Sequence, residues 1–239
     1  MTCSQNESDI RCEWGMQAVL RLAPISDAII IVDLFSFSTS VEIATARGAL
    51  VFPYNGKREE LDNFAQERDA QVAGFGIKTS GYSLSPHSLQ TIPSDFRLVL
   101  PSLNGSMLSL SAGDTPTFAG CLRNAAAVAR AAQRYGKCIS VIPAGERWRQ
   151  DGSLRPAYED WLGARAILSE LDGNFSAEAR AARAAFLDAK TELKTLISSC
   201  GSAKEHMEKG LVENLSLVCK LNVSNCTPGL INGTYRNLR

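Results

Sequence analysis

The sequence predicts an α/β fold in which a mostly parallel sheet is covered by helices. Short apolar runs of four or five residues recur along the chain, and residues Ala28–Val32 (AIIIV) are the clearest of them. A continuous β-branched run is typical of a strand buried on both faces. Helical patterns separate the runs, and a parallel strand pair needs such a crossover, so strand, loop and helix in repetition indicate parallel pairing.

The remaining elements follow in order along the chain. Further strands are predicted at residues 49–53, 97–100 and 138–142, and helices at 58–69, after residue 106, at 121–135 and at 158–171. Thr39-Ser40-Val41-Glu42 has the pattern of a capping box, which predicts a helix that begins there and ends at Gly48. Residues 176–221 are predicted to be mostly helical, giving a helical C-terminal third, and 222–239 to be a loop-rich polar tail. We expect one domain over residues 1–239, with a subdivision near residue 120 as the alternative.

Composition narrows the class of protein. Lys and Arg number 25 and Asp and Glu also number 25, so we expect neither a nucleic-acid partner nor a membrane partner. Seven cysteines without a Cys-x-x-Cys pair, and no signal peptide, predict reduced thiols in the cytoplasm. The two histidines are too few for a multi-histidine metal centre, and no Walker A, Asp-x-Asp or Gly-x-Ser-x-Gly motif occurs. The helical last third offers surface for a homodimer.

Polar residues follow three of the predicted strands, where ligands of open α/β sheets bind. Asp33 comes directly after the first strand and is followed by the hydroxyls of Ser36, Ser38 and Thr39. A carboxylate suits a hard cation, and a helix N-terminus suits a phosphate. The alternative is that Asp33 merely ends a strand and the hydroxyls cap a helix.

The other two loops offer further candidates. Asn104-Gly105-Ser106 gives a tight turn whose N–H groups could receive an anion, although such a pair is often only a turn. Gly145 and Glu146 follow the 138–142 strand, and Glu146 is either a ligand or base or simply an exposed loop acid. Candidate groups on helices are Arg123 and Asn124 for a phosphate and Glu159 and Asp160 for a metal. For all four the alternative is a solvated first helical turn.

Taken together, these stretches resemble the magnesium-dependent 2-phosphosulfolactate phosphatases, a family associated with coenzyme M biosynthesis. The matching stretches occur in the same order along nearly the whole chain: Ile31-Val32-Asp33 to Ala49, Ser85-Pro86, Asn104-Gly105-Ser106, Gly120 to Ala125, Ala144-Gly145-Glu146, Glu159-Asp160 with Gly163-Ala164, and the Gly210 segment. The resemblance implies Mg²⁺ and hydrolysis of a small acidic phosphate ester, with 2-phosphosulfolactate as the expected substrate.

The resemblance also implies roles for individual residues. Asp33 would be a metal ligand and catalytic carboxylate, with Glu146 as a second catalytic acid. Glu159 and Asp160 are the further metal candidates. The expected substrate-binding set is Ser36, Ser38, Thr39, Asn104, Gly105, Ser106, Arg123, Asn124 and Gly145.

Three positions depart from the family pattern. Ser36 stands where the family usually has arginine, Phe75 replaces the glutamate of a Gly-Glu-Arg stretch, and Leu84 replaces the asparagine of Asn-Ser-Pro. Arginine is the natural bidentate clamp for phosphate. The alternative function is therefore a weakened or inactive member that binds a small anion or a partner. A nucleotide-binding α/β protein is a third option, but it would need a glycine fingerprint that the sequence lacks.

Overall fold

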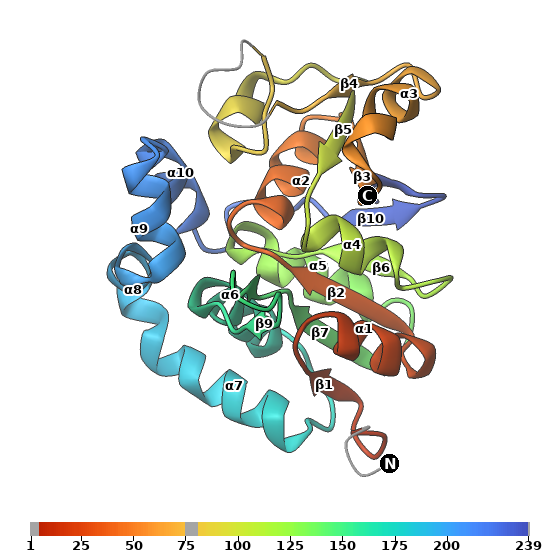
Figure 1. The fold of residues 1–239 in the computed structure, drawn as a ribbon. Coiled ribbons are helices and arrows are strands. Elements are labelled where there is room, and N and C mark those ends of the chain that lie inside the picture. The colour runs from red at the N-terminus through yellow and green to blue at the C-terminus, as the bar shows by residue number, and fades with distance from the viewer. Residues whose placement is uncertain (1–4, 75–80, 239) are drawn as a thin grey trace.

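The computed structural model describes residues 5–74 and 81–238, and it contains one nine-stranded sheet and a separate two-stranded hairpin (Figure 1). The strand order in the sheet is β1-β7-β2-β6-β10-β11-β3-β5-β4. The strands are β1 (Ile10–Cys12), β2 (Ala28–Val32), β3 (Leu50–Tyr54), β4 (Gln71–Val72), β5 (Arg97–Pro101), β6 (Thr117–Ala119), β7 (Ile139–Pro143), β10 (Pro228–Ile231) and β11 (Thr234–Asn237). The small hairpin pairs β8 (Glu146–Arg147) with β9 (Leu154–Arg155).

Most strand pairs are parallel, which confirms the predicted α/β class. One parallel set contains β1, β7, β2 and β6, and the other contains β3, β5 and β4. The antiparallel hairpin of β10 and β11 joins them, pairing with β6 on one side and with β3 on the other.

The twist of the sheet brings the ends of the two parallel sets together. Three of the five pairings between β2 and β5 are antiparallel, so the two sets run in opposite senses along the sheet. Rotation of about 20–25° at each step amounts to about 100–125° over five steps. The loop after β5 consequently lies against the loop after β2, where Gly105 hydrogen-bonds Asp33.

The β2 run shows why the sheet needs helices on both faces. All five of its residues are buried, and their side chains alternate between the two faces. Ile30 and Val32 pack with residues of α5 (Ala125–Ala132), α6 (Tyr158–Ser169) and α7 (Ala177–Ala189), whereas Ile29 and Ile31 pack with residues of α1 (Gly15–Leu22) and α4 (Gly105–Leu110). Burial of each such side chain contributes roughly 1.5–3 kcal/mol, so β2 anchors both layers.

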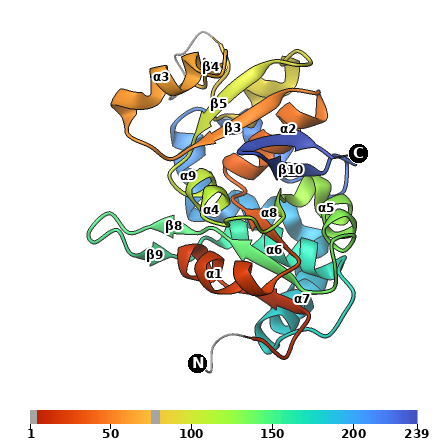
Figure 2. The same ribbon diagram turned by 90° about the vertical axis from the view of Figure 1, so that its right-hand side faces the viewer.

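Some helices cover the sheet, and the last four follow one another along one side of the molecule and pack into the same core (Figures 1 and 2). Those against the sheet are α1 (Gly15–Leu22), α2 (Phe37–Ala46), α3 (Leu61–Gln66), α4 (Gly105–Leu110), α5 (Ala125–Ala132) and α6 (Tyr158–Ser169). The chain then continues through α7 (Ala177–Ala189), α8 (Leu193–Ser199), α9 (Gly201–Glu208) and α10 (Val212–Val218). No helix in the described ranges has the length and apolar character that crossing a membrane requires.

Two local predictions are wrong. Helix α2 begins at Phe37, so Thr39 and Ser40 lie inside it, and buried Glu42 pairs with Arg123 instead of closing a capping box. The segment predicted as a loop-rich tail contains β10 and β11 in the middle of the sheet. In this segment buried Tyr235 faces Phe37, with ring centroids 5.9 Å apart, and this packing stabilises strand structure in a stretch that looks polar.

Candidate active site

Asp33 follows β2 and lies almost entirely inside the protein. Its side chain is 6% exposed. One carboxylate oxygen, Oδ2, accepts a hydrogen bond from the Gly105 N–H at 2.9 Å and from the Ser102 hydroxyl at 3.4 Å. The other oxygen is 3.5 Å from the N–H of Phe37 at the start of α2. Asp33 therefore ties the loop after β2 to the loop after β5 and keeps acceptor capacity on Oδ1.

Asp160 joins the loop after β2 to the loop after β7. It lies in the first turn of α6 and is 4% exposed. Its two carboxylate oxygens accept hydrogen bonds from Leu34 N–H at 2.7 Å and from Gly145 N–H at 2.9 Å. Gly145 has a φ of +70°, which favours glycine at this turn. Both Asp160 oxygens are thus engaged in positioning backbone.

Glu146 forms the accessible side of this acidic site. Its Oε2 accepts a hydrogen bond from the Asn104 amide at 3.2 Å, so the loops after β5 and β7 are joined directly. A cavity of about 210 Å³ opens beside this pair, and Asn104, Glu146 and Arg147 line it. The cavity is large enough for a small organic acid.

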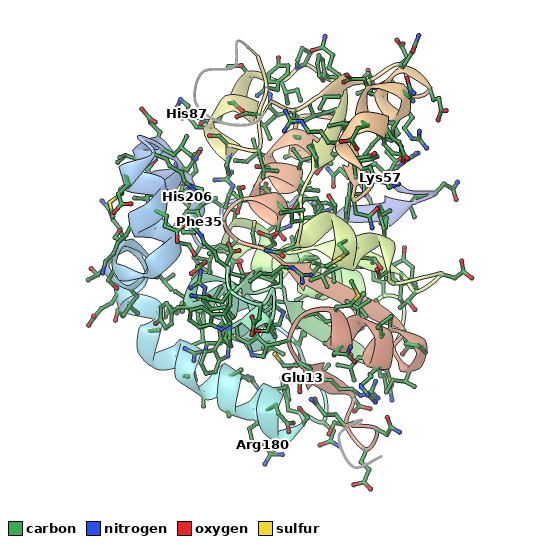
Figure 3. The ribbon with its side chains drawn as sticks, viewed as in Figure 1. Glu13, Phe35, Lys57, His87, Arg180 and His206 are labelled. Atoms are coloured by element: carbon green, nitrogen blue, oxygen red, sulfur yellow. The ribbon has the colours of Figure 1, made fainter. Side chains whose placement is uncertain are left out.

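Glu159, the neighbour of Asp160 on α6, is more deeply buried than Asp33, Asp160 and Glu146, with 2% of its surface exposed. It is hydrogen-bonded to the thiol of Cys200, which precedes α9, and burial raises the pKa of that thiol to about 12. Helix α9 also contacts the loop after β2, because the rings of Phe35 and His206 lie 4.9 Å apart (Figure 3). Helix α9 therefore closes one side of the acidic site.

Burial and mutual repulsion perturb the carboxyl groups. Burial, followed by the negative charge of Glu146, raises the pKa of Asp33 to about 7, against hydrogen bonds that favour ionisation. Burial also raises the pKa of Asp160 well above its usual value, with Asp33 and Glu159 adding to the effect. The pKa of Glu146 is raised by burial and by Glu159, whereas Arg155 and Asn104 lower it. Such a concentration of perturbed acids is typical of a functional site.

The predicted hydroxyls mostly hold backbone in place. Ser38 accepts from Asp33 N–H and donates to Ile31 C=O, and Thr39 donates to Leu34 C=O. Ser106 donates to Leu100 C=O. All three side chains are fully buried, so they shape the loops around Asp33. Ser36, 8% exposed, precedes α2, and its side chain makes no capping bond.

Arg123 and Asn124 lie apart from the acids. Arg123 pairs with Glu42 through Nε at 2.5 Å, and Asn124 donates to Ala119 and Cys226 carbonyls. None of the hydrogen bonds of these two described side chains reaches the acidic site. The structure therefore brings together Asp33, Asn104, Gly105, Gly145, Glu146, Glu159 and Asp160, and leaves Arg123 and Asn124 outside that group.

Arg155 is a neighbour of the site that the sequence analysis did not select. It lies on β9 directly opposite Glu146. Asp151-Gly152, a residue pair that favours turns, lies between the two short strands and is a local indication of a hairpin.

Comparison with known proteins bears on what these acids do. The family of 2-phosphosulpholactate phosphatases matches residues 17–233. The chain belongs to this family. A 2-phosphosulfolactate phosphatase of Methanothermobacter thermautotrophicus is 28% identical over 206 residues, which cover 85% of this chain and 86% of that protein. The prediction of a phosphoric monoester hydrolase is thereby confirmed.

The three departures from the family pattern have different surroundings in this 2-phosphosulfolactate phosphatase family member. Ser36 is in the loop that follows Asp33, and the Leu84 carbonyl accepts a hydrogen bond from Ser40 of α2. Phe75 lies outside the described residues. Of the two departures within the described residues, Ser36 is thus the one that lies in the loop carrying Asp33.

Proposed function

We propose that this protein is a Mg²⁺-dependent phosphatase that converts 2-phosphosulfolactate to sulfolactate and phosphate. The family match supports the reaction class. The observation that carries the rest is the grouping of Asp33, Glu146, Glu159 and Asp160, of which Glu146 lines a small cavity. These acids come from loops after β2 and β7 and from the start of α6.

The donor set fits Mg²⁺. Within residues 5–74 and 81–238, no group of three or more His, Cys, Asp and Glu side chains is close enough to hold a metal ion. Mg²⁺ is usually bound through one or two carboxylates, keeping several waters and taking substrate phosphate as a further ligand. Asp33 would hold it, since its Oδ1 is the less engaged of its two carboxylate oxygens. A cation would also offset the repulsion that raises the pKa values of these acids.

The chain's own residues orient the reactants. When bound, Mg²⁺ supplies positive charge that neutralises the phosphate and activates water. The Asn104 amide donates at the mouth of the cavity, and Asp160 fixes Leu34 and Gly145 so that the loops around the cavity keep their spacing. Glu146 is the proton carrier, because its raised pKa moves it toward neutral pH, where a general acid or base is most effective.

Phosphate release tests the proposal. Purified protein is assayed with 2-phosphosulfolactate in Mg²⁺ and in EDTA, together with Asp33→Asn and with Asp62→Asn, a control at an exposed acid of α3. We expect release in Mg²⁺ only, loss of at least 100-fold in Asp33→Asn by analogy with other electrostatic stabilisers, and no change in the control. Release that is insensitive to EDTA, or retained in Asp33→Asn, contradicts the proposal.

A second function is favoured by one observation. No Lys or Arg side chain of the described residues hydrogen-bonds the four acids, and Ser36 occupies the position of the family arginine. A member without turnover would bind a small anion in the same cavity. It would show a rise in melting temperature with sulfolactate, and no phosphate release from any ester.

A further inference from the structure

The β8–β9 hairpin places a cation beside the acidic site. The hairpin extends away from the body of the molecule near α1 (Figure 2). Its strands pair antiparallel, with Glu146 opposite Arg155. Residues directly opposite in such a pair have Cβ atoms about 4.5–5.5 Å apart on the same face. Arg155 therefore lies next to the acid at the mouth of the cavity.

The surroundings of Arg155 show where its guanidinium extends. One terminal nitrogen, Nη1, lies 3.9 Å from the position that a Cβ on Gly201 would occupy, at the start of α9. Its Cζ is 5.7 Å from the ring centre of Trp148. The guanidinium thus lies between the hairpin and the start of α9.

The guanidinium is also uncommitted. Among the residues that the structure describes, its N–H groups form no hydrogen bond and no ion pair, although Glu146 is close enough for Arg155 to lower the pKa of that acid. Arginine carries five N–H donors in a planar fork that matches carboxylate and sulfonate oxygens. A partly buried arginine with free donors, paired across the hairpin with an acid that lines the cavity, is arranged to receive an anion.

We propose that Arg155 binds the second acidic group of the substrate, the sulfonate or carboxylate that does not react. The phosphate then lies toward Asn104, Gly105 and Asp33, and the remote acid lies toward Arg155 and α9. This inference rests on the proposed function and adds a specificity determinant to it. A positive charge here also offsets the repulsion between the acidic site and a polyanionic substrate.

A pair of substrates separates this role from a structural one. Steady-state kinetics are measured in Mg²⁺ with 2-phosphosulfolactate and with ethyl phosphate, which has no second acid. The variants are Arg155→Met, Arg155→Lys and the control Arg149→Met, at an exposed arginine in the same hairpin's turn. We expect Arg155→Met to raise KM for 2-phosphosulfolactate about ten- to hundredfold, the loss of a charged hydrogen bond, and to leave kcat/KM for ethyl phosphate within about twofold. Arg155→Lys should be intermediate, because it keeps the charge and loses the fork.

If Arg155→Met lowers kcat/KM equally for both esters, the inference is overturned, because equal losses would indicate general damage to the site. A wild-type protein that hydrolyses neither ester contradicts the proposed function alone. In that case the inference is judged by the melting temperature in sulfolactate. It stands if sulfolactate stabilises the wild type and Arg149→Met but not Arg155→Met, and it falls with any other pattern.

Discussion

Replacing Asp33 with asparagine is expected to stabilise the metal-free protein at neutral pH. Asp33 is 6% exposed and its pKa is raised from 3.8 to about 7. A carboxyl whose folded-state pKa exceeds its unfolded value costs stability as pH rises between the two values. The difference of about 3 pKa units corresponds to at most about 4 kcal/mol, since each unit is worth about 1.4 kcal/mol.

Asparagine removes this loss of folding stability but introduces a smaller loss of its own. Its amide cannot accept from both Gly105 and Phe37 N–H groups, which costs about 1–2 kcal/mol. The net gain of about 1–3 kcal/mol should raise the melting temperature by about 2–12 °C for a chain of this size. The gain should be present at pH 8 and absent near pH 4. At pH 4 the folded Asp33 carboxyl is neutral, and partial ionisation of the unfolded carboxyl, whose pKa is 3.8, costs less than about 1 kcal/mol.

Thermal unfolding in EDTA from pH 4 to pH 8 measures this difference, with Asp62→Asn as the exposed control. Added Mg²⁺ should stabilise the wild type more than Asp33→Asn, so that the gap narrows. The reasoning is refuted if Asp33→Asn melts below the wild type at pH 8 in EDTA, or if the gap between them does not depend on pH.

Three further changes test other parts of the structure. Arg123→Met leaves Glu42, which is 0% exposed, without its partner, and should cost about 3–5 kcal/mol in urea unfolding; a neutral result would show that the pair is not needed. Asp160→Ala removes the hydrogen-bond acceptor for the Leu34 and Gly145 N–H groups. We expect kcat to fall about 10- to 100-fold, as for other residues that orient metal ligands. Activity within twofold of wild type would contradict the positioning role. Gly105→Ala would overlap the Phe37 ring and should cost about 1–3 kcal/mol. Gly201→Ala, whose Cβ meets nothing nearer than 3.9 Å, is its control, and equal melting temperatures would contradict the overlap.

The sequence predicts the buried strands well because their pattern is local. Ala28–Val32 is a strand as expected, and the runs at 97–100 and 138–142 correspond to β5 and β7. The order of strands depends on long-range packing, which no local pattern contains. The hairpin of β10 and β11 had a local signal nevertheless: Asn232 and Gly233 have φ of +49° and +73°, as expected for an Asn-Gly hairpin turn.

The candidate site was predictable where it depends on strand ends. Asp33, Asn104 and Glu146 follow strands and meet in the structure. Arg123 was not predictable, because its partner Glu42 lies 81 positions away and only the fold brings them together. Mg²⁺, the homodimer, the single domain and the cytoplasmic location stay predictions.

The position of the β10–β11 hairpin has a consequence for how the chain folds during synthesis. Residues 228–237 fill the centre of a sheet whose other strands all come from residues 10–143. Until they leave the ribosome, β6 and β3 each present an open edge, which invites pairing with other chains. A nascent chain halted before residue 228 should thus require chaperones, although it already contains all four acids.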